Sequence, residues 1–164
     1  FDGKVIAGSF DKSLYGLSLK DGVRQWSIEG DNWFWAGAVT DGRTIFAPNM
    51  DGNIYALDRS GNLLWKHDVG SAIVSTPVLV PNGLVVAGKD GKLLLLNTST
   101  ENLSWQREKH SIQFRDTEIK APLFSVGDSV YVGSQDKTVR RIDFKDGQRN
   151  VWCLDTRREG GCVN

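Results

Sequence analysis

Few side chains in this sequence have the types and spacings that chemistry requires. His67 and His110 are the only histidines, and they do not share the spacing of a metal-binding motif. A catalytic triad would need one of them as its base, yet nothing marks a nucleophile. Both histidines are expected on the surface, His67 just after a tryptophan and His110 in an insertion. The sequence therefore predicts no catalytic residue and no metal site.

The cysteines admit two interpretations. Cys153 and Cys162 are the only two, and the flexible pair Gly160-Gly161 lies between them. A disulfide across this short loop would pin the C-terminal tail and would indicate an oxidising compartment. Two free cysteines are the alternative, because unpaired cysteine is common in protein interiors.

Charge and hydropathy exclude two classes of partner. The chain has 20 Lys and Arg against 20 Asp and Glu, a formal net charge of zero, whereas nucleic-acid binding needs clustered positive charge. The basic pairs at 140–141 and 157–158 have acidic neighbours, which indicates a solvated surface. No apolar run approaches the ~20 residues of a membrane-spanning helix, so we expect neither nucleic acid binding nor direct membrane insertion.

Two independent markers repeat along the chain with a period of about 40 residues, the length of a propeller blade. The first is an aspartate that opens a turn, and the second is a tryptophan that closes the same phrase. The aspartates are Asp11, Asp51, Asp90 and Asp136, and the tryptophans are Trp26, Trp65, Trp105 and Trp152. The last interval is longer, which predicts an insertion around Glu108 to Glu118.

Each repeat contains short β-branched or aromatic runs separated by turn dipeptides. The predicted outer strands are 5–10, 14–19, 44–47, 54–58, 84–87, 93–97, 129–132 and 139–144, and a further strand in each repeat carries the tryptophan. The predicted innermost strands are 36–40, 75–80 and 121–126. Each repeat is therefore expected to be a four-stranded antiparallel meander. Stacking such sheets about an axis buries their faces, so the predicted fold class is an all-β propeller.

We expect a single propeller domain or fragment with repeats at about 1–30, 31–70, 71–107 and 108–155 and a tail at 156–164. Phe1-Asp2-Gly3 aligns with the first hairpin turn, so the first blade lacks its innermost strand. The four repeat tryptophans are expected to cover apolar surface where neighbouring blades meet. Three arrangements fit an open propeller: part of a seven- or eight-bladed ring, two copies joined through their open ends, or a four-bladed ring.

These repeats resemble the PQQ-like, quinoprotein-type β-propeller family. Its repeat has a Val-Tyr-Val-Gly strand, an Asp-Gly turn, Leu-Tyr-Ala-Leu-Asp, a Thr-Gly turn and a docking tryptophan. The clearest matches here are Ile54 to Asp58 with Trp65, and Val130 to Gly133 with Asp146-Gly147. Pro77 and Pro122 match a proline common in the family's innermost strand. Departures occur at Glu101, where glycine is usual, and at Arg141, where a small residue is usual.

The resemblance implies a choice between enzymatic and non-enzymatic members. The quinoprotein alcohol dehydrogenases have adjacent cysteines in a disulfide, a calcium ion held by carboxylate and amide oxygens, and an aspartate base. Here the two cysteines are not adjacent, and Asp51-Gly52-Asn53 is better explained as a hairpin turn. We therefore expect no cofactor. The non-enzymatic members include an outer-membrane assembly lipoprotein and extracytoplasmic sensor domains.

The most unusual local feature is Trp33-Phe34-Trp35, which leads into the innermost strand of the second repeat. The equivalent residues are taken as 73–75 in the third repeat and 118–120 in the fourth. Strand alternation would direct Trp33 and Trp35 to one side and Phe34 to the other. Packing between blades is one explanation, and an aromatic anchor for a partner is the other.

The sequence thus predicts a non-catalytic binding or scaffold module that mediates protein–protein interaction outside the cytoplasm, in the periplasm or at the cell surface. The partner is expected to be a protein, and self-association through the open ends is a further expectation. The candidate surface is Trp33, Phe34 and Trp35 with the insertion near Glu108 to Glu118. The alternatives are a fragment of a PQQ-dependent dehydrogenase and a ligand-sensing propeller domain.

Overall fold

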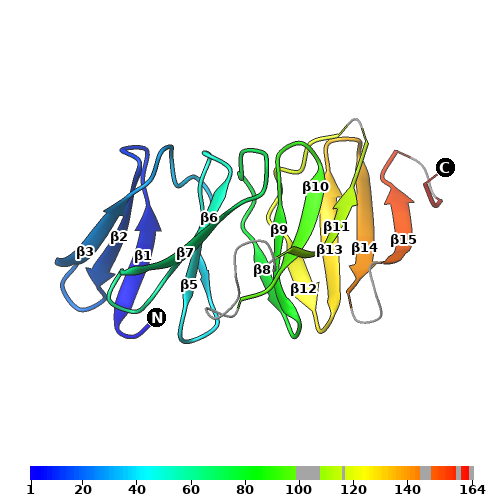
Figure 1. The fold of residues 1–164 in the computed structure, drawn as a ribbon. Helices are drawn as coiled ribbons and strands as arrows, with labels where there is room; N and C mark the ends of the chain where they lie inside the picture. Colours follow the sequence, from blue (N-terminus) through cyan, green and yellow to red (C-terminus); the bar gives the residue numbers. More distant parts are fainter. Residues whose placement is uncertain (99–107, 116, 145–148, 158–159, 163–164) are drawn as a thin grey trace. The chain divides into compact units, whose positions relative to one another are not determined.

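A computed structural model describes residues 1–98, 108–115, 117–144, 149–157 and 160–162 (Figure 1). The regular elements of these residues are strands, and they form one three-stranded and three four-stranded antiparallel sheets. The first sheet has the order β1-β2-β3, and the others are β4-β5-β6-β7, β8-β9-β10-β11 and β12-β13-β14-β15. The strands are β1 Lys4–Gly8, β2 Ser13–Ser18, β3 Arg24–Glu29, β4 Val39–Thr40, β5 Ile45–Pro48, β6 Asn53–Leu57, β7 Leu63–Asp68, β8 Val78–Val80, β9 Gly83–Ala87, β10 Lys92–Leu96, β11 Glu108–Gln113, β12 Phe124–Val126, β13 Ser129–Ser134, β14 Thr138–Asp143 and β15 Arg149–Asp155.

The sheets confirm the predicted all-β propeller blades. Each is a meander in which consecutive strands pair, and the first lacks an innermost strand, as predicted. The chain divides into two compact units, Phe1–Val74 with the first two sheets and Ser75–Asn164 with the last two. The single-domain organisation stays a prediction. Within the part of the chain that the structure describes, no helix has the length and apolar character needed to span a bilayer.

The core of each unit comes mainly from the middle strands, several of which are buried at consecutive residues. In the first unit, Leu14, Phe34, Ile45, Ala47, Tyr55 and Leu57 form one buried cluster. In the second, the cluster spans both sheets and includes Val85, Leu93, Leu95, Ile119, Val130 and Ile142. Burial of these side chains is the main favourable term that holds the sheets of a unit together.

The predicted insertion is misplaced. Residues 108–113 form β11, which pairs with β10 and so extends the third sheet to Gln113. Residues 97–107 separate β10 from β11, whereas 58–62 separate the equivalent strands of the second sheet, so the additional residues precede β11. Trp105 lies outside the described residues. His110 is an exposed residue of this strand and not of an insertion, and His67 is half-buried in β7 and not on the surface.

The innermost strands are shorter than predicted because the residues before them make different contacts. In the second unit, Ser75 Oγ donates to the Ala121 carbonyl at 2.6 Å, and Ser125 Oγ donates to the Leu79 carbonyl at 3.1 Å. The Leu123 N–H also donates to the Thr76 carbonyl at 3.2 Å. These bonds join the innermost segments of two adjacent blades, so β8 and β12 are linked by hydrogen bonds outside their own sheets.

The repeated aspartate explains why each phrase begins as it does. One oxygen of Asp11, Asp51, Asp90 and Asp136 accepts the N–H two residues on, which closes an Asx-type turn. In three of the four, the other oxygen accepts a hydrogen bond from the side chain four residues on. Tyr15 donates to Asp11 at 2.5 Å, Tyr55 to Asp51 at 2.6 Å and Arg140 to Asp136 at 2.7 Å. The carboxylate thus ties the turn to the strand that follows it.

The fourth repeat replaces this tyrosine by Arg140. Its guanidinium donates to Asp136 and to Ser134 Oγ, and it lies 4.7 Å from the centre of the Phe114 ring, which follows β11 of the preceding blade. Burial alone would raise the pKa of Asp136. The hydrogen bonds from Arg140, Ser134 and Thr138 outweigh this effect and hold the pKa well below its usual value of 3.8.

This carboxylate should make the stability of the second unit pH-dependent. A pKa lowered in the folded state stabilises above the unfolded value, near 4, and the stabilisation is lost as the pH falls below it. Asp136→Asn should therefore cost about 1 kcal/mol at pH 7, and the difference from wild type should shrink towards pH 2.5. Urea denaturation at both pH values measures it. Arg140→Met should reduce the same pH dependence, and an unchanged difference at pH 2.5 would contradict the assignment.

Candidate interaction site

The site begins with a segment whose side chains are alternately exposed and buried although the segment belongs to no sheet. Residues 33–35 precede β4 and are not part of its ladder. Phe34 is 3% exposed, while its neighbours Trp33 and Trp35 are 41% and 57% exposed. The alternation predicted from the sequence is therefore present, but Phe34 belongs to the core and its predicted place on a partner-binding surface is wrong. We call residues 33–35 and their equivalents the entrance segments.

Phe34 is held between the first two sheets by several contacts. Its N–H donates to the Ser9 carbonyl at 3.4 Å, and its ring meets Tyr55 edge-on at 5.3 Å between centroids. At Gly8, a Cβ would overlap the Phe34 carbonyl oxygen and lie 2.6 Å from the Phe34 Cβ. At Gly30, a Cβ would lie 2.9 Å from the same ring. Glycine at both positions is thus what allows Phe34 to enter.

The two outward tryptophans meet a third aromatic side chain. Phe10, which is 61% exposed, lies 5.1 Å from the ring of Trp33 at an interplanar angle of 70° and 5.2 Å from the ring of Trp35 at 47°. Both distances are within the range of favourable aromatic pairs. We call Phe10, Trp33 and Trp35 the aromatic cluster. It exposes three large rings side by side on one surface of the first unit.

Sequence reasoning missed Phe10. It was assigned to the first strand, but β1 ends at Gly8 and Phe10 lies in the turn before Asp11. It belongs to the repeat before the one that contributes the tryptophans. Only the contact between adjacent blades brings them together.

Polar contacts fix the backbone beneath the cluster. The Met50 N–H donates to the Trp33 carbonyl at 2.9 Å, and the buried Asn49 donates its side-chain amide to the Asn32 carbonyl at 2.7 Å. Burial and the hydrogen bond to Asp51 raise the pKa of Tyr55, so this hydroxyl stays protonated and continues to donate to Asp51. Hydrogen bonds therefore hold the backbone that carries the exposed rings.

Backbone hydrogen bonds that recur between blades show which residues of the entrance segments are equivalent. Ile73 N–H donates to the Asn49 carbonyl at 3.3 Å, as Phe34 does to Ser9, so Ile73 is the equivalent of Phe34 and the predicted set 73–75 is shifted by one residue. Gln135 N–H donates to the Glu118 carbonyl, as Met50 does to Trp33, which makes Ile119 the third equivalent. Phe34, Ile73 and Ile119 are all buried. They are the anchors of three entrance segments.

The positions around each anchor differ in chemistry. The equivalents of Phe10, Trp33 and Trp35 in the last pair of blades are Lys89, Glu118 and Lys120. Their side chains form ion pairs, with Nζ of Lys120 at 2.5 Å and Nζ of Lys89 at 3.8 Å from the Glu118 carboxylate. Hydrogen bonds from Lys120 and then its charge lower the pKa of Glu118. Aromatic side chains at these positions are therefore not a requirement of the fold.

The described repeat tryptophans occupy different environments. Trp26 lies between the first two blades, because a Cβ on Gly16 would lie 2.5 Å from its Nε1 and a Cβ on Gly61 would lie 2.5 Å from its Cδ2. Trp65 is buried, with its ring 5.8 Å from Phe46. Trp152 is 42% exposed, with its ring 6.1 Å from that of Tyr131. A docking role for Trp65, Trp105 and Trp152 stays a prediction.

Cys153 and Cys162 form a disulfide, with their Cα atoms 5.4 Å apart. The Cys162 N–H also donates to the Cys153 carbonyl at 3.2 Å, and Leu154 bridges to Gly161. The tail therefore turns back along the outer edge of β15. Of the two interpretations that the sequence left open, the structure contains the bridge.

The turn carboxylates do not form a calcium donor set. Both oxygens of Asp11, Asp51 and Asp136 accept hydrogen bonds from their own hairpins, and a calcium ion needs six to eight oxygen ligands directed at one point. Among the described residues, no group of three or more His, Cys, Asp or Glu side chains could hold a metal ion. The described turn carboxylates therefore do not form the calcium site that the resemblance to the quinoprotein dehydrogenases implies.

Antiparallel four-stranded blades with this repeated turn and entrance define a β-propeller built from PQQ-like repeats. The family model described as "Outer membrane protein assembly factor BamB" matches residues 11–160. The chain belongs to this family.

Individual relatives are distant. The BamB of Bordetella pertussis (strain Tohama I) is 26% identical over 105 residues, which are 64% of this chain and 27% of that protein. The quinohemoprotein alcohol dehydrogenase ADH-IIG of Pseudomonas putida is 26% identical over 138 residues, 80% of this chain and 19% of that protein. The crystal structure of BamB from Moraxella catarrhalis has a TM-score of 0.74 at 19% identity, over 88% of this chain and 44% of that one. The chain spans about a fifth to a quarter of the length of these curated relatives.

The close approach at Gly8 gives a paired stability test. Gly8→Ala should destabilise the chain by about 2 kcal/mol, because a backbone carbonyl must move to admit the methyl group. Gly133→Ala, at the equivalent position of the fourth blade, should change stability by less than about 0.5 kcal/mol, because a Cβ there comes no closer than 3.8 Å to Ala121. Urea denaturation compares the two. Equal losses would show that Phe34 does not constrain Gly8.

Proposed function

We propose that this chain is a non-catalytic binding module of a longer propeller protein, and that the aromatic cluster is its contact surface for a protein partner. The observation that carries the proposal is the exposure of Phe10, Trp33 and Trp35 around a buried Phe34. Three large rings exposed together are less stable in water than they would be if their apolar surface were buried. A partner that covers them recovers it.

The chemistry of the cluster suits a protein partner. Tryptophan and phenylalanine supply large contact areas with few rotatable bonds, and such residues dominate the binding free energy of many interfaces. Asp31, two residues before Trp33, forms an exposed ion pair with Lys66, with 3.7 Å between Oδ2 and Nζ, and would supply a polar rim. Because members of this family are described as outer membrane protein assembly factors, we propose a partner that acts in the same process.

We also propose an extracytoplasmic location. The disulfide between Cys153 and Cys162 supports it, because such bonds persist in oxidising compartments. The outer-membrane process in the family description supports it as well.

A site-specific photocrosslinker tests the contact surface in the native host. With p-benzoylphenylalanine replacing Trp33 or Trp35, irradiation should yield one discrete crosslinked protein. The same group at Leu63, an exposed apolar residue of β7, is the matched control and should give at least tenfold less of it. Mass spectrometry identifies the adduct. Equal yields from all three positions would contradict a specific surface.

The match to a quinohemoprotein alcohol dehydrogenase favours a second candidate, a segment of a PQQ-dependent enzyme. Titration of the purified chain with PQQ and calcium separates the two. The binding module predicts no saturable change in the quinone absorbance. Saturable binding with dye-linked alcohol oxidation would support the enzyme and overturn the proposal.

A further inference from the structure

The aromatic cluster presents hydrogen-bond donors to water as well as apolar rings. Trp33 and Trp35 are exposed, and each carries an indole N–H that has no acceptor among the described residues. A ligand that covers the rings takes these two donors out of water, and a buried donor without an acceptor is unfavourable. The segment that covers the cluster must therefore offer free carbonyl or other acceptor groups together with apolar side chains.

Both edges of the segment that carries the tryptophans are engaged within the chain. On one edge, the Phe34 N–H donates to the Ser9 carbonyl of the first blade. On the other, the Trp33 carbonyl accepts the Met50 N–H of the second blade at 2.9 Å. The Trp33 N–H donates to the side chain of Asn32 at 2.8 Å. Because strand addition needs an exposed backbone edge, a ligand must be recognised here by side chains.

Two kinds of regular segment can bury apolar side chains without pairing to a strand, a helix and a polyproline II segment. A helix uses its carbonyls internally up to its last turn, so it has few acceptors for two indole donors. A polyproline II segment has no internal hydrogen bonds, and its carbonyls are free along its whole length. Proline also has no N–H that would need an acceptor on the protein. The donors of the cluster therefore favour a proline-rich segment.

The turn that contains Phe10 contributes a negative charge. Asp11 is exposed, and hydrogen bonds, first that from the Tyr15 hydroxyl, lower its pKa, so the carboxylate is ionised at neutral pH. Its oxygens accept from the Ser13 N–H and from Tyr15, and each retains a second lone pair. Charge complementarity therefore favours a ligand that has a basic residue next to its prolines.

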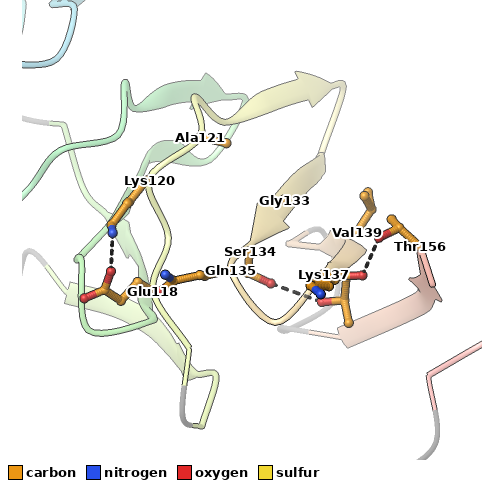
Figure 2. A pocket seen from close by; sticks show the side chains of 10 residues that line it. Glu118, Lys120, Ala121, Gly133, Ser134, Gln135, Lys137, Val139 and Thr156 are labelled. Carbon is orange, nitrogen blue, oxygen red and sulfur yellow. Dashed lines mark hydrogen bonds and ion pairs between the residues drawn. The ribbon is translucent and has the colours of Figure 1, made fainter.

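The apolar surface continues beyond the cluster within the first unit. The equivalents of the cluster at the next junction of blades are half-buried apolar residues, Met50, Ala72 and Val74. The hydrogen bond from the Met50 N–H to Trp33 places Met50 beside the cluster. In the second unit the corresponding positions are charged, and the side chains of Glu118 and Lys120 point toward each other (Figure 2). An extended apolar ligand is therefore suited to the first unit.

We propose, as a refinement that rests on the proposed function, that the aromatic cluster binds a proline-rich segment of the partner in the polyproline II conformation, with a basic residue at one end. The prolines would pack against the rings of Phe10, Trp33 and Trp35. The two indole N–H groups would donate to carbonyls of the segment, and the basic residue would lie near Asp11. Aromatic side chains bind proline-rich peptides in this way in unrelated folds.

Titration of the ¹⁵N-labelled full chain with synthetic peptides tests the proposal, with the indole N–H resonances as the readout. A peptide of one arginine followed by a run of prolines should bind saturably below about 1 mM and shift the resonances of Trp33 and Trp35. A peptide of alternating valine and threonine, which favours a strand, should bind about tenfold more weakly. A helix-forming peptide rich in alanine and leucine should also bind about tenfold more weakly. Glutamate in place of the arginine should weaken binding about threefold.

Single substitutions assign the resonances and test the donors. Trp33→Phe and Trp35→Phe keep an aromatic ring but remove the N–H, so each should weaken binding of the proline peptide about tenfold. Trp152→Phe, at an exposed tryptophan of the fourth blade, is the matched control and should leave the affinity unchanged. Equal affinity for the strand- or helix-forming peptide, an equal shift of the Trp152 resonance, or no binding of the proline peptide at about 1 mM would overturn the proposal.

Photocrosslinking from Trp33 and Trp35 separates this proposal from the proposed function. Fragment mapping of the adduct should place the crosslink in or next to a run of prolines in the partner. A discrete adduct without binding of the proline peptide would overturn the proline-rich segment and leave the contact surface standing. The absence of a discrete adduct would instead overturn the proposed function.

Discussion

The rest of the first unit depends on how Phe34 packs between two sheets. The space for it exists because Gly8 and Gly30 carry no Cβ. The close packing of Phe34 against Gly8 also brings the Phe34 N–H to the Ser9 carbonyl, to which it donates. In an extended segment the residues on either side of a buried one must point the other way. Trp33 and Trp35 are exposed for this reason, and Phe10 meets them because it follows the strand that receives Phe34.

The same arrangement carries different chemistry at different blades. Anchors at Phe34, Ile73 and Ile119 serve the fold, so their character is limited to apolar side chains. The flanking positions are not limited in this way, and they hold two tryptophans in one entrance segment and the Glu118–Lys120 pair in another. A propeller can therefore vary these exposed positions without changing the bonds that join its blades, and the proposed role of the aromatic cluster as a partner contact would be such a variation.

Much of the fold could be predicted because its determinants are local. The turn aspartates bond to their own hairpins, so each marks a repeat without any knowledge of tertiary structure. The errors arose where contacts between repeats decide the outcome. Phe10 and the register of Ile73 depend on a neighbouring blade, and the added residues were placed at 108–118 although Glu108 to Gln113 pair with β10. The cysteine pairing was left open because the separation of their Cα atoms, 5.4 Å, is set by how the tail turns.

The central claim is that a buried anchor holds two tryptophans in water. Incorporation of 5-fluorotryptophan, with each ¹⁹F resonance assigned by a single Trp→Phe substitution, measures this directly through the solvent isotope shift between H₂O and D₂O. The account predicts large shifts for Trp33 and Trp35 and a small one for Trp65, which is 8% exposed. Shifts for Trp33 and Trp35 as small as that of Trp65 would contradict it.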